Sequence, residues 1–161
     1  MQSESAIGSY GRPYPRSAAR AQRLVTDLHL AAYRLSGGRL GGTLLGMPML
    51  LLSTWGRKTG LLRTAPLLYL PAEGALVLVA SNGGAQRSPT WFYNLEANPH
   101  ALVQVGPARG EVISALASET QRARLWPQLL DVYAGYASYQ ARTDRQIPVV
   151  LLYPQDNRML H

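Results

Sequence analysis

Cysteine is absent from this 161-residue chain, and histidine and lysine are scarce. Without cysteine, the chain can form no disulfide, hold no thiolate-bound metal and use no thiol nucleophile. The three histidines, at positions 29, 100 and 161, lack the spacing of metal ligands, so we expect no metal site. No apolar run is long enough for a transmembrane helix, and the N-terminus lacks the apolar region of a signal peptide. These absences predict a cytoplasmic protein.

Positive charge dominates the residues that are present. Sixteen basic residues against nine acidic ones give a net charge of +7, and Lys58 is the only lysine among them. Such an excess attracts nucleic acid, anionic lipid or an acidic cofactor. We expect no nucleic-acid partner, because aromatic residues are not interleaved with a clear basic stripe. The 47% hydrophobic content is enough for a full core in a chain of this length.

The N-terminal region combines a polar tail with one helix. Residues 1–15 are rich in Ser, Gly, Pro and Tyr and predict no regular structure. Apolar residues at helical spacing follow over 17–35, and Gly37 and Gly38 end the helix. The basic residues on its opposite side are Arg16, Arg20 and Arg23. Such a basic amphipathic helix suits a membrane surface or a pocket mouth, and it also suits ordinary packing on the domain.

The remaining chain consists of short apolar segments between tight turns. It predicts strands at 49–54, 63–70, 75–81, 101–105, 109–116 and 147–153, and helices at 89–98 and 118–139. The continuous apolar run of 75–81 predicts a strand buried on both faces. A capping box at residues 118–121 begins the last helix, and Pro127 predicts a kink or break in it. This pattern indicates an α+β protein that is mostly β, with antiparallel strands forming a barrel flanked by helices.

Three cations are concentrated in the turn between the first two strands. The turn contains Arg57, Lys58 and Arg63, with Gly56 and Gly60 at its ends and the hydroxyls of Thr59 and Thr64 beside them. Freed backbone N–H groups and cationic side chains form an anion cradle of the kind that phosphates occupy. The residue order of a Walker A loop is absent. The alternative interpretation is a solvated basic hairpin turn.

Two further segments extend the pattern of the basic turn. Residues 56–67 contain GRKTG followed by RTAPL, residues 79–84 read VASNGG, and residues 91–99 read WFYNLEANP. In this order and spacing, the three segments resemble the deazaflavin-dependent nitroreductase family, over roughly residues 44–154. The resemblance implies a split β-barrel, similar to FMN-binding split barrels, and coenzyme F-420, an 8-hydroxy-5-deazaflavin. It divides the chain into a tail and basic helix at 1–43 and a deazaflavin-binding barrel at 44–161.

A tyrosine-rich segment near the C-terminus points to one branch of this family. Tyr133, Tyr136 and Tyr139, followed by QARTDRQIP, look like the segment of the nitroimidazole-activating branch, whose members are quinone reductases. The resemblance implies hydride transfer from reduced F-420 to a quinone, a nitroaromatic or a conjugated enone. On one helix, the three tyrosines would span about 120° and face one side. They would stack on the acceptor and donate O–H bonds, with Ser81 as a further donor; the alternative is an aromatic core stripe.

The same resemblance assigns the cofactor site. The cations of the turn would meet the phosphodiester and acidic tail of F-420, and the strand at 66–68 would meet its ring. Trp91 would cover the ring or the tail, or else fill the core, and Asn94 would bind the phosphate region or serve a local structural role. The expected cofactor-binding residues are Arg57, Lys58, Thr59, Gly60, Arg63, Thr64, Pro66, Leu67, Leu68, Ser81, Asn82, Gly83, Gly84, Trp91 and Asn94.

Two other functions share the same barrel. An FMN-binding split-barrel oxidoreductase would exchange the cofactor, and a storage protein would hold the deazaflavin without turnover. We expect a monomer or a homodimer that binds a small-molecule acceptor, with peripheral membrane contact through the basic helix as a further possibility.

Overall fold

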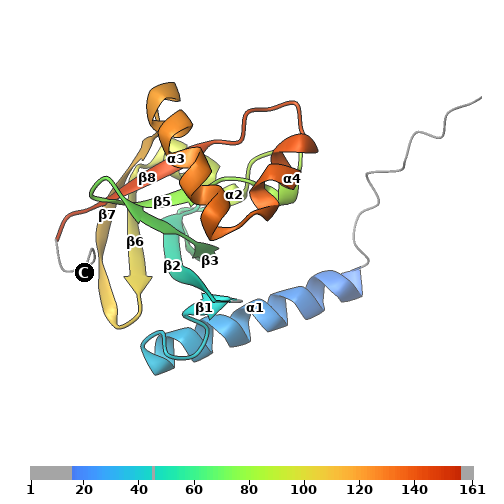
Figure 1. The fold of residues 1–161 in the computed structure, drawn as a ribbon. Coiled ribbons are helices and arrows are strands. Elements are labelled where there is room, and N and C mark those ends of the chain that lie inside the picture. Colours follow the sequence, from blue (N-terminus) through green and yellow to red (C-terminus); the bar gives the residue numbers. More distant parts are fainter. Residues whose placement is uncertain (1–15, 45, 157–161) are drawn as a thin grey trace, which may run out of the picture.

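The curled sheet of this protein matches the barrel expected from its sequence. A computed structural model describes residues 16–44 and 46–156. Within them, eight strands form one antiparallel sheet, with helices packed around it (Figure 1). The strands are β1 (Thr43–Leu44), β2 (Met47–Trp55), β3 (Leu62–Leu68), β4 (Leu70–Ala72), β5 (Ala75–Val79), β6 (His100–Val105), β7 (Ala108–Leu116) and β8 (Val149–Pro154). The helices are α1 (Arg16–Ser36), the 3₁₀ turn η1 (Asn82–Gly84), α2 (Thr90–Ala97), α3 (Glu119–Val132) and α4 (Gly135–Ala141).

The strand order brings the two ends of the sheet together. The order is β1-β2-β6-β7-β8-β5-β4, and β3 pairs with the other side of β2 from Met49↔Leu68 to Trp55↔Leu62. Strands β3 and β4 therefore lie at opposite ends of the sheet, although Tyr69 alone separates them in the chain. The sheet must curl to satisfy this connection, which confirms the predicted split barrel.

Two apolar clusters hold the barrel and its helices together. Inward side chains such as Leu50, Leu78 and Val112 fill the barrel with residues of α2. On the outer face of β5 and β8, the second cluster includes Leu125 and Leu129 of α3 and Tyr136 of α4. All of β5 is consequently buried, which confirms that this segment is covered on both faces.

The predicted helix at 118–139 is two helices. The capping box forms as expected, because Ser118 accepts from the Gln121 amide at 3.2 Å and its own amide donates to the Gln121 side chain at 3.0 Å. However, α3 continues through Pro127, so the predicted break there is wrong. Leu125 and Leu129 are buried on either side of the proline, and their packing offsets the hydrogen bond that proline cannot make.

The break occurs instead at Tyr133, which is extended with φ −150° and ψ 101°. Gly135 follows, and a side chain added at this glycine would overlap the Tyr133 ring. The ring therefore folds back over Gly135, and α4 starts in a new direction. The prediction that one helix presents the three tyrosines at i, i+3 and i+6 is wrong.

Helix α1 lies at the opposite end of the barrel from α3 and α4 (Figure 1). Tyr33 anchors its last turn and is fully buried. Its hydroxyl donates to the Met49 carbonyl at 3.0 Å and accepts from the Gly106 amide at 2.8 Å. The predicted boundary between residues 43 and 44 falls within β1, and the division of the chain there stays a prediction. Among the described residues, no helix has the length and apolar character needed to cross a bilayer.

Candidate functional site

The basic turn between β2 and β3 is tight, and glycine is needed at both of its ends. The Gly56 amide donates to the Leu61 carbonyl at 2.8 Å, and the Gly60 amide donates to the Gly56 carbonyl at 2.7 Å. Gly60 has φ +68°, which disfavours other residues. A side chain at Gly56 would come within 2.7 Å of the Thr59 hydroxyl. The glycines thus shape the turn that carries Arg57 and Lys58.

Asn94 of α2 fixes this turn to the barrel. Its side chain is 2% exposed, accepts from the Arg57 amide at 3.1 Å and donates to the Thr54 hydroxyl at 3.0 Å. Both side-chain groups of Asn94 are therefore used to position the turn. This geometry supports the local structural role, and a contact of Asn94 with phosphate stays a prediction.

A cavity of about 510 Å³, which we call the anion cavity because of the charge of its lining, opens beside the turn. Its lining includes four cations and several neutral donors: Gly56, Arg57, Lys58, Thr59, Arg63, Asn82, Arg87, Ser88, Thr90, Tyr93 and Asn94. In the part of the chain that the structure describes, none of these four cations forms an ion pair with a carboxylate. Ser88 and Thr90 also place the N-terminal end of α2 here, where the helix dipole favours negative charge. The cavity therefore has uncompensated positive charge.

A second cavity, of about 310 Å³, is mostly apolar. It is lined by Met47, Met49, Pro66, Leu67, Leu68, Val79, Ser81, Tyr133, Tyr136 and Tyr139. Its polar side chains are hydroxyls only. Ser81 lines this cavity and the next residue, Asn82, lines the anion cavity, so the chain passes from the wall of one cavity to the wall of the other at this point. A ligand with an apolar ring and an acidic tail has a compartment for each part.

The three tyrosines cluster although they do not share one helix. The Tyr133 and Tyr139 hydroxyls lie 3.0 Å apart, and the Tyr133 and Tyr136 rings meet edge-on with centroids 5.1 Å apart. Burial, followed by the neighbouring Tyr139 and Tyr133, raises the pKa of Tyr136 to about 12. Tyr136 is 6% exposed and packs in the outer cluster, yet it also lines the apolar cavity. The tyrosines therefore belong to the apolar core and also line the cavity, so the two interpretations of this segment do not exclude each other.

Some predicted site residues lie away from both cavities. The Thr64 hydroxyl is 2.7 Å from that of Ser53 and accepts from Arg34 at 2.9 Å. These partners lie on the face of β3 opposite to the anion cavity, because Arg63 and Thr64 alternate along the strand. Trp91 is 7% exposed inside the barrel and meets Phe92 edge-on. Thr64 and Trp91 thus line neither cavity, and the position of Trp91 agrees with the alternative that it fills the core. A contact of either residue with the cofactor stays a prediction.

The glycines predicted to bind the cofactor have backbone conformations that favour glycine. Gly60 closes the basic turn, and Gly83, with φ +64°, has open space where a side chain would stand. Gly84 is buried and lies close to α4, because an added side chain would come within 2.6 Å of the Tyr139 carbonyl oxygen. The predicted contact of Gly83 and Gly84 with the cofactor stays a prediction.

Sequence reasoning missed several residues of the two cavities. In the anion cavity these are Arg87, Ser88, Thr90 and Tyr93, and in the apolar cavity Met47, Met49 and Val79. Tyr93 was inside a matching segment, and its ring lies under the Arg57 guanidinium at 4.9 Å. Arg87 could have been noticed as an isolated cation between two matching segments. No local signal distinguishes the two methionines from core residues.

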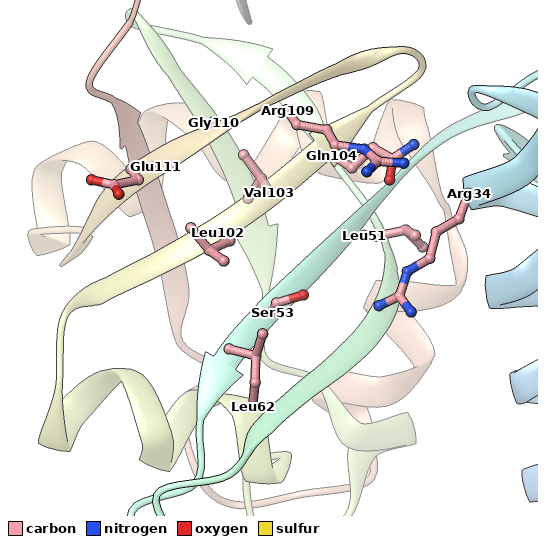
Figure 2. A pocket seen from close by; sticks show the side chains of 10 residues that line it. All are labelled: Arg34, Leu51, Ser53, Leu62, Leu102, Val103, Gln104, Arg109, Gly110 and Glu111. Carbon is pink, nitrogen blue, oxygen red and sulfur yellow. The ribbon is translucent and has the colours of Figure 1, made fainter.

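A third cavity, of about 530 Å³, lies between α1 and the outer face of β2, β6 and β7 (Figure 2). Arg34, Arg109 and Glu111 line it above an apolar floor that includes Leu51 and Leu102. None of the predicted site residues lines this cavity, although it is slightly larger than the anion cavity. The two cavities therefore differ in the chemistry of their linings rather than in volume.

Comparison with known proteins agrees with this geometry. The family model described as F420H(2)-dependent quinone reductase matches residues 25–154. The chain is 44% identical over 129 residues to an F420H(2)-dependent quinone reductase of Mycobacterium tuberculosis, covering 78% of this chain and 87% of the relative. A solved structure described as an F420-H2 Dependent Reductase (FDR-A) is 35% identical with a TM-score of 0.60, over 65% of this chain and 93% of that one.

Two other solved structures extend the comparison. One is described as a domain-swapped dimer; it is 30% identical with a TM-score of 0.63, over 86% of this chain and 98% of that one. The heme storage protein HutZ of Vibrio cholerae has a TM-score of 0.50 at 13% identity, over 67% of this chain and 82% of that one. The likeness to HutZ concerns the fold alone.

Proposed function

This chain belongs to the F420H(2)-dependent quinone reductase family, and from that premise we propose that it reduces a quinone with hydride from reduced F-420. The observation that carries the proposal is that two unlike cavities are lined by the consecutive residues Ser81 and Asn82. One cavity is cationic and the other is apolar with hydroxyls. F-420 has an acidic tail and a flat ring, which correspond to these two compartments.

The charge of the unpaired cations is complementary to the negative charge of this cofactor. Arg57, Lys58, Arg63 and Arg87 surround one cavity, and within the described residues no carboxylate neutralises them. They would hold the phosphodiester and the acidic tail by charge-assisted hydrogen bonds, with Thr59 and Ser88 as neutral donors. An anion bound there needs to displace no internal ion pair.

The apolar cavity would receive the ring. The backbone of residues 66–68 and the Ser81 hydroxyl would contact its polar edge, while the methionine and leucine side chains pack on its faces. When bound in its reduced form, F-420 supplies a hydride from C5 of the deazaflavin. The protein contributes position and exclusion of water.

The phenols would serve the acceptor. Reduction of a quinone to a quinol consumes one hydride and one proton, and negative charge develops on a ring oxygen. The Tyr136 phenol is protonated at neutral pH, and its pKa, raised to about 12, keeps it protonated in alkaline solution as well, so it would act as a hydrogen-bond donor. In the Tyr133–Tyr139 pair one hydroxyl donates to the other, which leaves one O–H hydrogen for the acceptor. The same donors would suit a nitroaromatic or an enone.

Tyr136→Phe is expected to lower quinone turnover about tenfold and to change the F-420 dissociation constant less than about twofold. The contacts of Tyr136 with Tyr133 and Tyr139 are made by its ring, which phenylalanine keeps. Steady-state kinetics with menadione and a fluorescence titration with F-420 separate the two effects. Tyr153→Phe, on the exposed side of β8, is the matched control. Equal kinetics of Tyr136→Phe and wild type across several acceptors would exclude the donor role.

One experiment tests the proposed function and its two rivals. The purified protein is titrated separately with F-420 and FMN, and then mixed with reduced F-420 and menadione. We expect F-420 binding and return of the oxidised deazaflavin absorbance. Tight FMN binding without F-420 binding would favour the FMN oxidoreductase. Binding without reoxidation above the enzyme-free control would favour storage.

We also propose that α1 contacts a membrane surface. Val25, Leu28 and Leu35 share helical spacing and are 67%, 62% and 89% exposed, with Arg34 and Arg39 nearby. Leu28→Asp with Leu35→Asp is expected to abolish cosedimentation with anionic phospholipid vesicles. Leu116→Asp, at a 63% exposed leucine of β7, is the control and should sediment like wild type. Equal sedimentation of all three proteins would refute the contact.

A further inference from the structure

Arg145, in the segment between α4 and β8, spreads its guanidinium over a single loop. Nη2 donates to the Ser81 carbonyl at 2.8 Å and to the Ala80 carbonyl at 3.2 Å. Nε donates to the Ala85 carbonyl at 2.8 Å, and Nη1 donates to the Ser88 hydroxyl at 3.1 Å. One side chain thus bonds both ends and the middle of the segment 80–88.

That segment forms a wall of both proposed compartments. Ser81 lines the apolar cavity, and Asn82, Arg87 and Ser88 line the anion cavity. The segment lies outside the sheet, so strand pairing does not hold it. Asn82, Gly83 and Gly84 have φ of 47°, 64° and 80°, a run of left-handed residues that neighbouring groups must maintain. The carbonyls bound by Arg145 flank this run.

The other side of Arg145 is tied to the tyrosine helix. Gln140 of α4 donates from Nε2 to the Arg145 carbonyl at 2.8 Å. Thr143 accepts from the Arg145 amide at 3.4 Å and donates to Gln86 Oε1 at 3.1 Å. Helix α4 also carries Tyr136 and Tyr139. Arg145 therefore connects the element that carries two of the phenols to the loop that carries Ser81 and Ser88.

Arginine suits this place better than lysine. The four acceptors lie in different directions, and a planar guanidinium with five fixed N–H groups can reach them together, whereas an ammonium cannot. In the described residues, no carboxylate pairs with Arg145, so its contacts are with backbone and hydroxyl oxygens.

We propose that Arg145 is a positioning residue of the reductase site. It holds the 80–88 loop at a fixed position relative to the phenols, and so holds the cofactor at a fixed position relative to the acceptor. This inference rests on the proposed function. It assigns Arg145 no contact with either substrate. Its effect is expected in the geometry of the loop first, and in cofactor affinity and turnover as a result.

The test compares Arg145→Ala and Arg145→Lys with wild type by amide hydrogen exchange, without cofactor. We expect exchange of residues 82–88 to rise at least about tenfold in both variants, with the strands β2 and β6 unchanged. F-420 affinity is expected to fall about tenfold, and turnover at saturating F-420 to fall as well. Added guanidinium at millimolar concentration should restore part of the affinity of Arg145→Ala. Arg124→Ala, on the exposed side of α3, is the control.

Unchanged exchange of residues 82–88 would overturn the inference, and so would faster exchange with unchanged affinity and turnover. If Arg145→Ala does not fold, Arg145→Lys provides the same comparison, since it keeps the charge and side-chain length. Failure of the wild-type protein to bind F-420 would instead refute the proposed function, and with it the role of Arg145 in a reductase site.

Discussion

Replacing Arg57 or Lys58 with alanine is expected to weaken F-420 binding roughly 10- to 150-fold. Each change removes a charge-assisted hydrogen bond, which contributes about 1.5–3 kcal/mol net. Both side chains are exposed on the turn, and the turn is held by its glycines and by the bond from the Arg57 amide to Asn94. Neither replacement removes these backbone contacts, so the fold should persist.

Isothermal calorimetry with F-420, together with thermal unfolding, separates affinity from stability in these variants. Arg109→Ala is the matched control, because Arg109 is an exposed arginine that lines the cavity on the other face of the sheet (Figure 2). It should bind F-420 like wild type. Added salt should weaken wild-type binding more than that of Lys58→Ala, since one ion pair fewer is screened. Unchanged affinity in both turn variants would mean that the tail binds elsewhere.

Gly84→Ala is expected to lower turnover about a hundredfold and stability by roughly 2–5 kcal/mol. Gly84 has φ +80°, and the new side chain would come within 2.6 Å of the Tyr139 carbonyl oxygen and 3.0 Å of its Cα. Because both are backbone atoms, α4 itself must shift. Tyr136 and Tyr139 would move with it, away from the Ser81 wall of the apolar cavity.

Gly83→Ala provides an internal control for this effect. Gly83 also has positive φ, at +64°, but nothing lies within 4 Å of the added side chain. It should cost about 1–2 kcal/mol from the backbone alone and keep most of its turnover. Thermal unfolding of the two variants measures the cost of backbone strain, and menadione kinetics measures the effect of displacing α4. Equal turnover of Gly84→Ala and Gly83→Ala would show that the position of α4 does not matter.

The sequence predicted the parts of the site that depend on local pattern. Glycines, alternating apolar residues and clustered cations predicted the hairpin and its cationic turn, because each acts over a few neighbouring residues. The same alternation separates Thr64 from the anion cavity: it follows Arg63 in a strand, so the two side chains face opposite sides of the sheet. Its cross-strand partner is Ser53, which the sequence pattern alone did not indicate.

Contacts between segments that are distant in the chain could not be predicted from the sequence. The helix break at Tyr133 depends on its ring folding over Gly135, and helical spacing gave no sign of it. Likewise, Arg145 meets Ser81 and Ser88 from 64 and 57 residues away. Such contacts exist only once the barrel has formed. The sequence could therefore suggest which residues bind, but not which residues hold them in place.

The seam of the barrel has a consequence for association between molecules. Strands β3 and β4 are the two ends of the sheet, and each contains a proline, Pro66 and Pro71. A proline has no N–H to offer an approaching strand, so it interrupts the ladder through which sheet edges aggregate. The two prolines therefore make pairing of β3 or β4 with a strand of another molecule less favourable.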